Sequence, residues 1–261
     1  MYKSKLLTFF SLLVYLFLYA PILVLIIFSF DESRLGVKWT GFTWKWYQSL
    51  FMDENVLSAL SNSLIVAAAA VTISTVMGVL AAVGLAGIRN KKLEAAARGL
   101  LILPVLVPEI AMAVSALLLF ISLGFSLGLT SVILAHVVFC LSYVTMTVSA
   151  RLEGMNPHLR EAALDLGVSP VKAFFKVTLP LLTPGIISGA MLAFVLSLDD
   201  FVITQFTAGV GATTLPLRIY SMVKFGVSPE INALSTLMLL VTLLIAGSAE
   251  FIRFRSEKPA H

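Results

Sequence analysis

The chain has 261 residues, of which 59% are hydrophobic and only 12% are charged. Because a soluble domain carries about 25% charged residues, this composition excludes a soluble globular protein and indicates a membrane protein. The single cysteine, Cys140, excludes a disulfide framework and a four-cysteine metal site. The net charge is +4, and its meaning depends on where the 18 Lys and Arg residues lie.

Six stretches are long and apolar enough to cross a membrane as helices. A spanning helix needs about 20 residues, because roughly 30 Å of hydrocarbon must be crossed at about 1.5 Å per residue. Two glycines, Gly124 and Gly128, predict a turn inside the longest charge-free run. The predicted spans are residues 6–30, 61–87, 100–122, 129–150, 181–207 and 231–252. We therefore expect an all-α membrane protein in which residues 1–261 form a single transmembrane domain.

The basic residues indicate how these spans are oriented. If the N-terminus lies inside, only five of the 18 Lys and Arg residues fall in outer segments. These are Arg34, Lys38, Lys45, Arg218 and Lys224. The positive-inside rule therefore predicts that both termini are cytoplasmic. The basic charge is then explained by anionic lipid at the inner surface, without a nucleic-acid partner.

A loop of about 30 residues, 151–180, separates the fourth and fifth spans on the cytoplasmic side. Asn156-Pro157 predicts a helix start, and residues 158–166 form a short amphipathic helix. Gly167 is expected to end this helix in the left-handed conformation. A second short helix begins at Ser169-Pro170. The two helices either pack on the inner ends of the spans or dock a soluble partner.

The sequence of this loop resembles the EAA loop of importer-type ABC transporter permeases. The matching residues are Glu161, Ala162, Ala163, Gly167 and, after nine intervening residues, Val177-x-Leu179-Pro180, with valine where isoleucine is usual. In that family the loop fits a cleft on a cytoplasmic ATPase. The resemblance implies that the segment from Glu161 to Gly167, including Asp165, couples this chain to an ATPase.

A wider resemblance, to permease subunits of polyamine ABC importers, covers essentially the whole chain. It is carried by residues 28–51, 196–202 and 215–233. It implies a bacterial inner-membrane location and a heterodimer with a second permease subunit. It also implies an ATPase dimer that holds ATP and Mg, and a periplasmic polyamine-binding protein. One departure is Glu109, where such permeases carry aspartate; the carboxylate is kept, with one more methylene.

Three acidic residues lie inside predicted spans: Glu109 near the midplane, and Asp199 and Asp200 in the outer half of the fifth span. A carboxylate in hydrocarbon costs several kcal/mol, so it is expected to be paired or to line a wet cavity. No Lys or Arg lies within a predicted span. A passing polyamine cation would supply the missing charge. The alternatives are pairing with Arg218 or Lys224, with the partner permease, or with interfacial water.

Ser197 and Trp46 are two further candidates for the substrate pathway. Ser197 lies close before the two aspartates, and its hydroxyl either contacts substrate or bonds back to its own helix. Trp46 lies with Trp39, Trp44 and Tyr47 in the first outer loop. This group is either an interfacial aromatic belt or a wall against which a cation lies on a ring face.

The chain has no G-x-x-x-x-G-K-[ST] motif, so ATP hydrolysis is assigned to a separate subunit, and no enzyme activity or cofactor is predicted here. His136 and Cys140 lie four residues apart but lack a third ligand, so core packing is predicted rather than a metal site. The predicted function is the permease subunit of an ATP-driven importer for spermidine, putrescine or both. The alternatives are an ABC permease for another cation or an amino acid, and an ion-gradient-driven secondary transporter.

Overall fold

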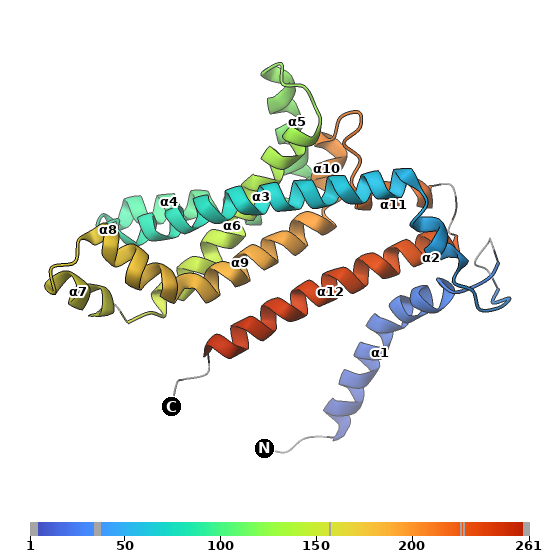
Figure 1. Cartoon of the computed structure of the whole chain (residues 1–261), viewed down its shortest axis with the longest axis horizontal. Helices are drawn as coiled ribbons and strands as arrows, with labels where there is room; N and C mark the ends of the chain where they lie inside the picture. The colour runs from blue at the N-terminus through green and yellow to red at the C-terminus, as the bar shows by residue number, and fades with distance from the viewer. Residues whose placement is uncertain (1–4, 34–37, 157, 225, 227, 258–261) are drawn as a thin grey trace. The chain divides into compact units, whose positions relative to one another are not determined.

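The computed structural model describes residues 5–33, 38–156, 158–224, 226 and 228–257, and these are helical except for turns, loops and one isolated β-bridge (Figure 1). The helices are α1 (Lys5–Phe28), α2 (Lys45–Leu50), α3 (Glu54–Ala86), α4 (Lys91–Leu106), α5 (Glu109–Ser122), α6 (Leu129–Glu153), α7 (His158–Asp165), α8 (Pro170–Ala173), the π-helix η1 (Phe174–Thr178), α9 (Leu179–Asp199), α10 (Val202–Thr207), α11 (Leu215–Val223) and α12 (Pro229–Glu257).

Among the described residues, five helical stretches are long and apolar enough to cross a membrane. They are α1, α3, α6, the continuous stretch Pro170–Asp199 and α12. A sixth span is possible only if the bent pair α4 and α5 counts as one. The predicted all-α membrane fold is confirmed, as is the turn between residues 122 and 129.

The prediction of one continuous helix over residues 100–122 is wrong. α4 ends at Leu106, α5 begins at Glu109, and their axes differ in direction by 103°. Val107 has an extended backbone, with φ −75° and ψ 138°. This conformation is expected because the ring of Pro108 excludes the helical region for the residue before it.

The prediction that the fifth span runs without interruption to about residue 207 is also wrong. α9 ends at Asp199, Asp200 is extended with φ −64° and ψ 127°, and a separate short helix, α10, begins at Val202. α10 packs mainly against α5 and also against α6. The break therefore redirects the chain at the two aspartates.

The chain divides into two compact units. The first contains residues 1–58 and 218–241, and the second contains residues 59–217 and 242–261. In the first unit, the region after α1 gathers aromatic rings. Phe30 lies within 4.8 to 5.2 Å of Phe42, Trp44 and Tyr47, measured between ring centroids.

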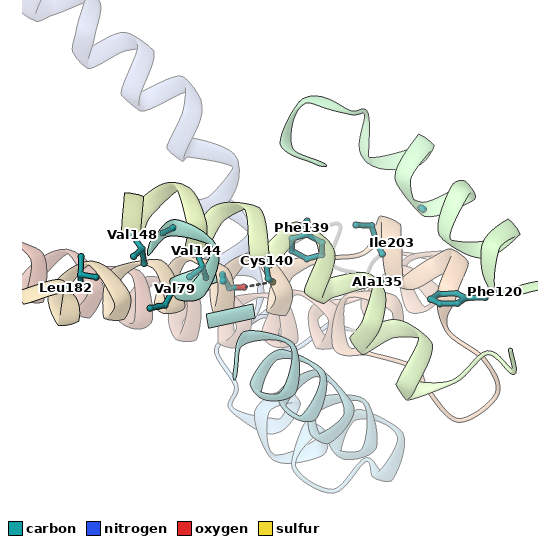
Figure 2. Packing of buried hydrophobic residues seen from close by; sticks show 12 residues of the cluster. Val79, Phe120, Ala135, Phe139, Cys140, Val144, Val148, Leu182 and Ile203 are labelled. Atoms are coloured by element: carbon teal, nitrogen blue, oxygen red, sulfur yellow. Dashed lines mark hydrogen bonds between the residues drawn. The ribbon is translucent and has the colours of Figure 1, made fainter. Parts of the chain in front are cut away.

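The core of the second unit forms where α6 packs against α9 (Figure 2). Val144 of α6 is fully buried between two glycines, Gly78 of α3 and Gly189 of α9. A Cβ atom at Gly78 would lie 2.7 Å from Val144 Cγ1, and one at Gly189 would lie 3.4 Å from Val144 Cα. The approach at Gly78 is too close for a side chain, whereas the one at Gly189 is an ordinary contact, and α6 is closely packed against both neighbours.

Candidate functional site

The break after α9 is built by the side chain of Asp200. Its Oδ2 accepts hydrogen bonds from the backbone N–H and the hydroxyl of Thr204, both at 2.9 Å, and its Oδ1 accepts from the N–H of Ile203 at 3.3 Å. The first N–H groups of a helix have no partner within the helix, and a preceding carboxylate satisfies them. Asp200 therefore ends one helix and starts the next.

His136 of α6 joins this arrangement from the opposite side. Its Nδ1 lies 2.8 Å from Ser197 Oγ, and its Nε2 lies 3.0 Å from Thr204 Oγ1 and 3.2 Å from Asp200 Oδ2. His136 and Thr204 are fully buried, and Ser197 and Asp200 are nearly so. We call these four residues, His136, Ser197, Asp200 and Thr204, the His136 cluster.

The cluster changes the interpretation of two predicted pathway residues. Ser197 is turned inward toward His136, a partner that neither sequence alternative named. Asp200 has a partner that the sequence analysis did not name, because Nε2 of His136 contacts its carboxylate. The role of Ser197 and Asp200 in the pathway stays a prediction, and in this structure both side chains are buried.

Asp199 and Glu109 differ from Asp200 because they are exposed. Asp199 is the last residue of α9, and its Oδ1 accepts a hydrogen bond of 3.2 Å from Thr242 Oγ1. Glu109 is the first residue of α5, directly after the bend at Pro108, and its side chain neighbours the Asp200 carboxylate. Two helix breaks thus bring three carboxylates to one region, two of them accessible to a ligand.

Trp46 belongs to the first unit and lies on α2. Its indole N–H donates a hydrogen bond of 2.7 Å to the backbone carbonyl of Asp31, so the ring is fixed to the end of α1. Lys45 Nζ lies 4.7 Å from the centroid of the Trp46 ring. This geometry shows that the ring can accept a cation on its face. A contact between Trp46 and substrate stays a prediction.

The predicted coupling loop has the expected local structure. α7 spans His158–Asp165, and Asn156 Oδ1 accepts from the N–H of His158 at its start; Pro157 lies outside the described residues. Gly167 has φ +79°, and its N–H bonds the carbonyl of Leu164 while that of Val168 bonds the carbonyl of Ala163. This pair of bonds is the Schellman arrangement that ends helices.

The residues predicted to couple to an ATPase lie on the accessible side of this loop. Glu161, Ala162, Asp165 and Gly167 are exposed, and Ala163 is partly buried. Glu161 Oε2 lies 3.0 Å from His158 Nδ1. Between α7 and the ends of α3 and α6 lies a mostly apolar cavity of about 750 Å³. The loop therefore lies next to the ends of α3 and α6, with this cavity between them.

The described residues contain no group of three or more His, Cys, Asp or Glu side chains arranged to hold a metal ion. Cys140 is fully buried and its Sγ lies 3.6 Å from the carbonyl of Ala193. Sequence reasoning placed His136 in the core but missed its contacts with Ser197 and Asp200. The signal available for these contacts was a histidine within an apolar span, where an ionisable side chain needs a partner.

Comparison with known proteins identifies the class of protein. Residues 74–257 match the family model described as binding-protein-dependent transport system inner membrane component. The chain belongs to this family. It is therefore a multi-pass membrane permease subunit of a transporter and not an enzyme, and this membership contradicts the alternative of an ion-gradient-driven secondary transporter.

Individual relatives are similar over nearly their whole length. The spermidine/putrescine transport system permease protein PotC of Haemophilus influenzae is 44% identical over 243 residues, which cover 93% of this chain and 94% of the relative. The putrescine transport system permease protein PotI of Escherichia coli K12 is 42% identical over 253 residues, covering 95% and 90%.

Solved structures support the fold. A chain of a bacterial ABC transporter that imports the acidic polysaccharide alginate superimposes with a TM-score of 0.76 at 18% sequence identity. The match covers 95% of this chain and 93% of that one. At this level of identity the likeness establishes the architecture alone.

Proposed function

We propose that this chain is the permease subunit of an ATP-driven importer for polyamines, spermidine or putrescine or both. The observation that carries the proposal is the identity of 42–44% with two polyamine permeases over more than nine-tenths of the chain. The exposed carboxylates of Asp199 and Glu109 suit such a cargo. Amines with pKa values near 10 give putrescine about two positive charges and spermidine about three at neutral pH.

The proposed assembly has four further components. A second, PotB-like permease forms a heterodimer with this chain and completes the pathway, two PotA-like ATPases bind ATP and Mg²⁺, and a PotD-like periplasmic protein delivers the polyamine. The permease lies in the bacterial inner membrane with both termini in the cytoplasm. Anionic lipid neutralises its inner basic residues.

In the proposed cycle, the binding protein releases polyamine at the outer mouth of the pathway, where Asp199 receives it. Glu109 offers the next anionic contact on the way in. Binding at these sites must stay weak, because a cation held by a complete cage of carboxylates would not be released inward. A few exposed acids, each separately placed, meet that requirement.

Energy enters through α7. ATP binding closes the ATPase dimer, and the exposed segment from Glu161 to Gly167 follows that movement. α8, η1 and α9 form one continuous helical stretch from Pro170 to Asp199, so displacement at the loop reaches the aspartates through a single helix. This continuity gives a physical route from the ATPase to the pathway.

The test is uptake of labelled spermidine and putrescine by cells that carry the full transporter, with Asp199→Asn compared to wild type. Loss of a charge-assisted contact should reduce uptake about tenfold. The matched control is Glu94→Gln, which removes a partly exposed carboxylate that pairs with Arg98 on α4. Full uptake by Asp199→Asn would remove this carboxylate from the pathway. Absence of polyamine uptake in wild type would show that the cargo is a different one.

A further inference from the structure

The polar groups of the His136 cluster satisfy one another through hydrogen bonds. The hydroxyl of Thr204 donates to Asp200 Oδ2. Because that hydrogen is used, Nε2 of His136 must carry the proton that it shares with Thr204 Oγ1 and Asp200 Oδ2. Nδ1 forms the other hydrogen bond of the ring, with the hydroxyl of Ser197 at 2.8 Å. Every polar atom of the ring has a partner, which a buried imidazole requires.

The four residues come from three helices and the break between two of them. His136 lies on α6, Ser197 lies near the end of α9, and Thr204 lies on α10, with Asp200 at the break between the last two. The imidazole therefore ties both sides of the break to a helix that is itself fixed in the core. Its ring also packs against Phe139, at 5.2 Å between centroids.

The exposed carboxylates depend on this arrangement for their position. Asp199 precedes Asp200 directly, and Glu109 neighbours the Asp200 carboxylate from α5. If the imidazole of His136 were removed, Asp200 would lose a hydrogen-bond donor inside the protein, where an unpaired charge is costly. The end of α9 and the start of α10 would then adopt a different geometry, and Asp199 would move with them.

We propose that His136 is a positioning residue of the transport pathway. It acts through Asp200 to hold the α9–α10 break, and thereby sets where Asp199 and Glu109 present their carboxylates. Asp200, in this arrangement, is a buried support for the exposed acids and does not bind the cargo itself. The inference deepens the proposed function and rests on it for its transport measurement.

The first test is a double-variant cycle on polyamine uptake by the full transporter, with His136→Leu, Asp200→Asn and the combination. Residues in one hydrogen-bond network show non-additive effects. We expect about tenfold loss for each single variant and little further loss in the combination. His136→Gln, whose amide can donate and accept, should retain most of the uptake. Independent, multiplicative losses, or equal losses for Gln and Leu, would overturn the proposal.

The matched control for this cycle is Cys140→Ser. Cys140 lies one turn from His136 on α6 and is equally buried, but its sulfur contacts a backbone carbonyl of α9 and not the cluster. We expect this variant to transport polyamine like wild type. A loss as large as that of His136→Leu would attribute the effect to general packing between α6 and α9, and would overturn the positioning role.

The second test does not depend on the cargo. Cys140 is the only cysteine in the chain, so Cys140→Ser provides a cysteine-free background. Ile203 of α10 is 2% exposed, and Ile203→Cys in that background should react slowly with a water-soluble thiol reagent. Adding His136→Leu should accelerate labelling about tenfold, since α10 is released, whereas His136→Gln should not.

The two tests separate the two proposals. If wild type takes up no polyamine but labelling accelerates in His136→Leu, the proposed cargo is wrong and the positioning role stands. If polyamine uptake is present but neither labelling nor the cycle responds as described, the positioning role is wrong and the proposed function stands.

Discussion

The ionised carboxylate of Asp31 accepts hydrogen bonds that stabilise the segment after α1. The carboxyl is fully buried, and burial raises its pKa. Three hydrogen bonds lower the pKa by more than burial raises it. They come from the N–H and the hydroxyl of Thr40, at 2.8 and 3.0 Å, and from the hydroxyl of Ser33, at 2.9 Å. The result is a pKa of about 2, below the ordinary value of 3.8.

The direction of this shift predicts how the segment responds to acid. Because the folded pKa lies below the unfolded one, the ionised Asp31 stabilises the segment above about pH 4. That contribution is lost as the pH falls toward 2. Tryptophan fluorescence should report the loss, since the Trp46 indole donates to the Asp31 carbonyl.

We expect the fluorescence of wild type to change near pH 2, and this change to be absent in Asp31→Asn, which should also be less stable at neutral pH. Glu32→Gln is the control, because Glu32 is the exposed neighbouring acid. An acid transition that survives in Asp31→Asn, or that disappears in Glu32→Gln, would contradict this assignment.

The carboxylates of the candidate site show what residue-level reasoning can and cannot predict. The cost of a charge in hydrocarbon was sufficient to select Glu109, Asp199 and Asp200. It could not separate the exposed Asp199 from the buried Asp200, because adjacent positions have the same hydropathy. Only the fold brings His136 to Asp200, from 64 positions earlier in the chain.

At the scale of elements, α7 is a helix of eight residues that depends on its ends. Gly167, at φ +79°, allows the chain to turn into α8, and a β-branched residue in this conformation is strained by about 1–3 kcal/mol. A Cβ atom at Gly167 would meet nothing within 4 Å. Any effect of substitution therefore comes from backbone conformation and not from a steric clash.

We expect Gly167→Val to reduce ATP-driven uptake strongly while the protein still inserts and assembles, because the Glu161 face of α7 is displaced. Gly167→Asn should be close to wild type, since asparagine tolerates the left-handed region. Uptake and membrane levels of both variants provide the measurement. Equal uptake by valine and asparagine variants would mean that this helix end does not take part in coupling.

The two broken spans show why element prediction failed where it did. Hydropathy measures whether a segment is apolar and contains no information on the direction of its axis. Pro108 was visible in the sequence as a helix breaker and explains the bend before Glu109. The second break has no proline. It arises because the Asp200 carboxylate accepts hydrogen bonds from the backbone N–H groups of the next turn. Whether the helix breaks at Asp200 depends on its tertiary contacts, which the composition does not reveal.

At the scale of the whole molecule, composition and the loop motif were sufficient for the class of protein. The apolar runs predicted an all-α membrane fold, and the spacing from Glu161 to Gly167 predicted an ABC permease; the helices and the family match confirm both. The direction of insertion rests on a different physical basis, the distribution of basic residues. It can be tested without knowledge of the cargo.

The cysteine-free background from Cys140→Ser allows such a test with one reporter on each predicted side. Met52, just after α2, is 82% exposed, and Leu166, at the end of α7, is 84% exposed. Because 13 of the 18 Lys and Arg residues lie in segments predicted to be inside, Met52→Cys should react with an impermeant thiol reagent in intact spheroplasts. Leu166→Cys should react only after the membrane is opened. The reverse pattern would invert the topology and place α7 on the side where no ATPase could reach it, whereas the expected pattern leaves the exposed face of α7 available to a cytoplasmic partner.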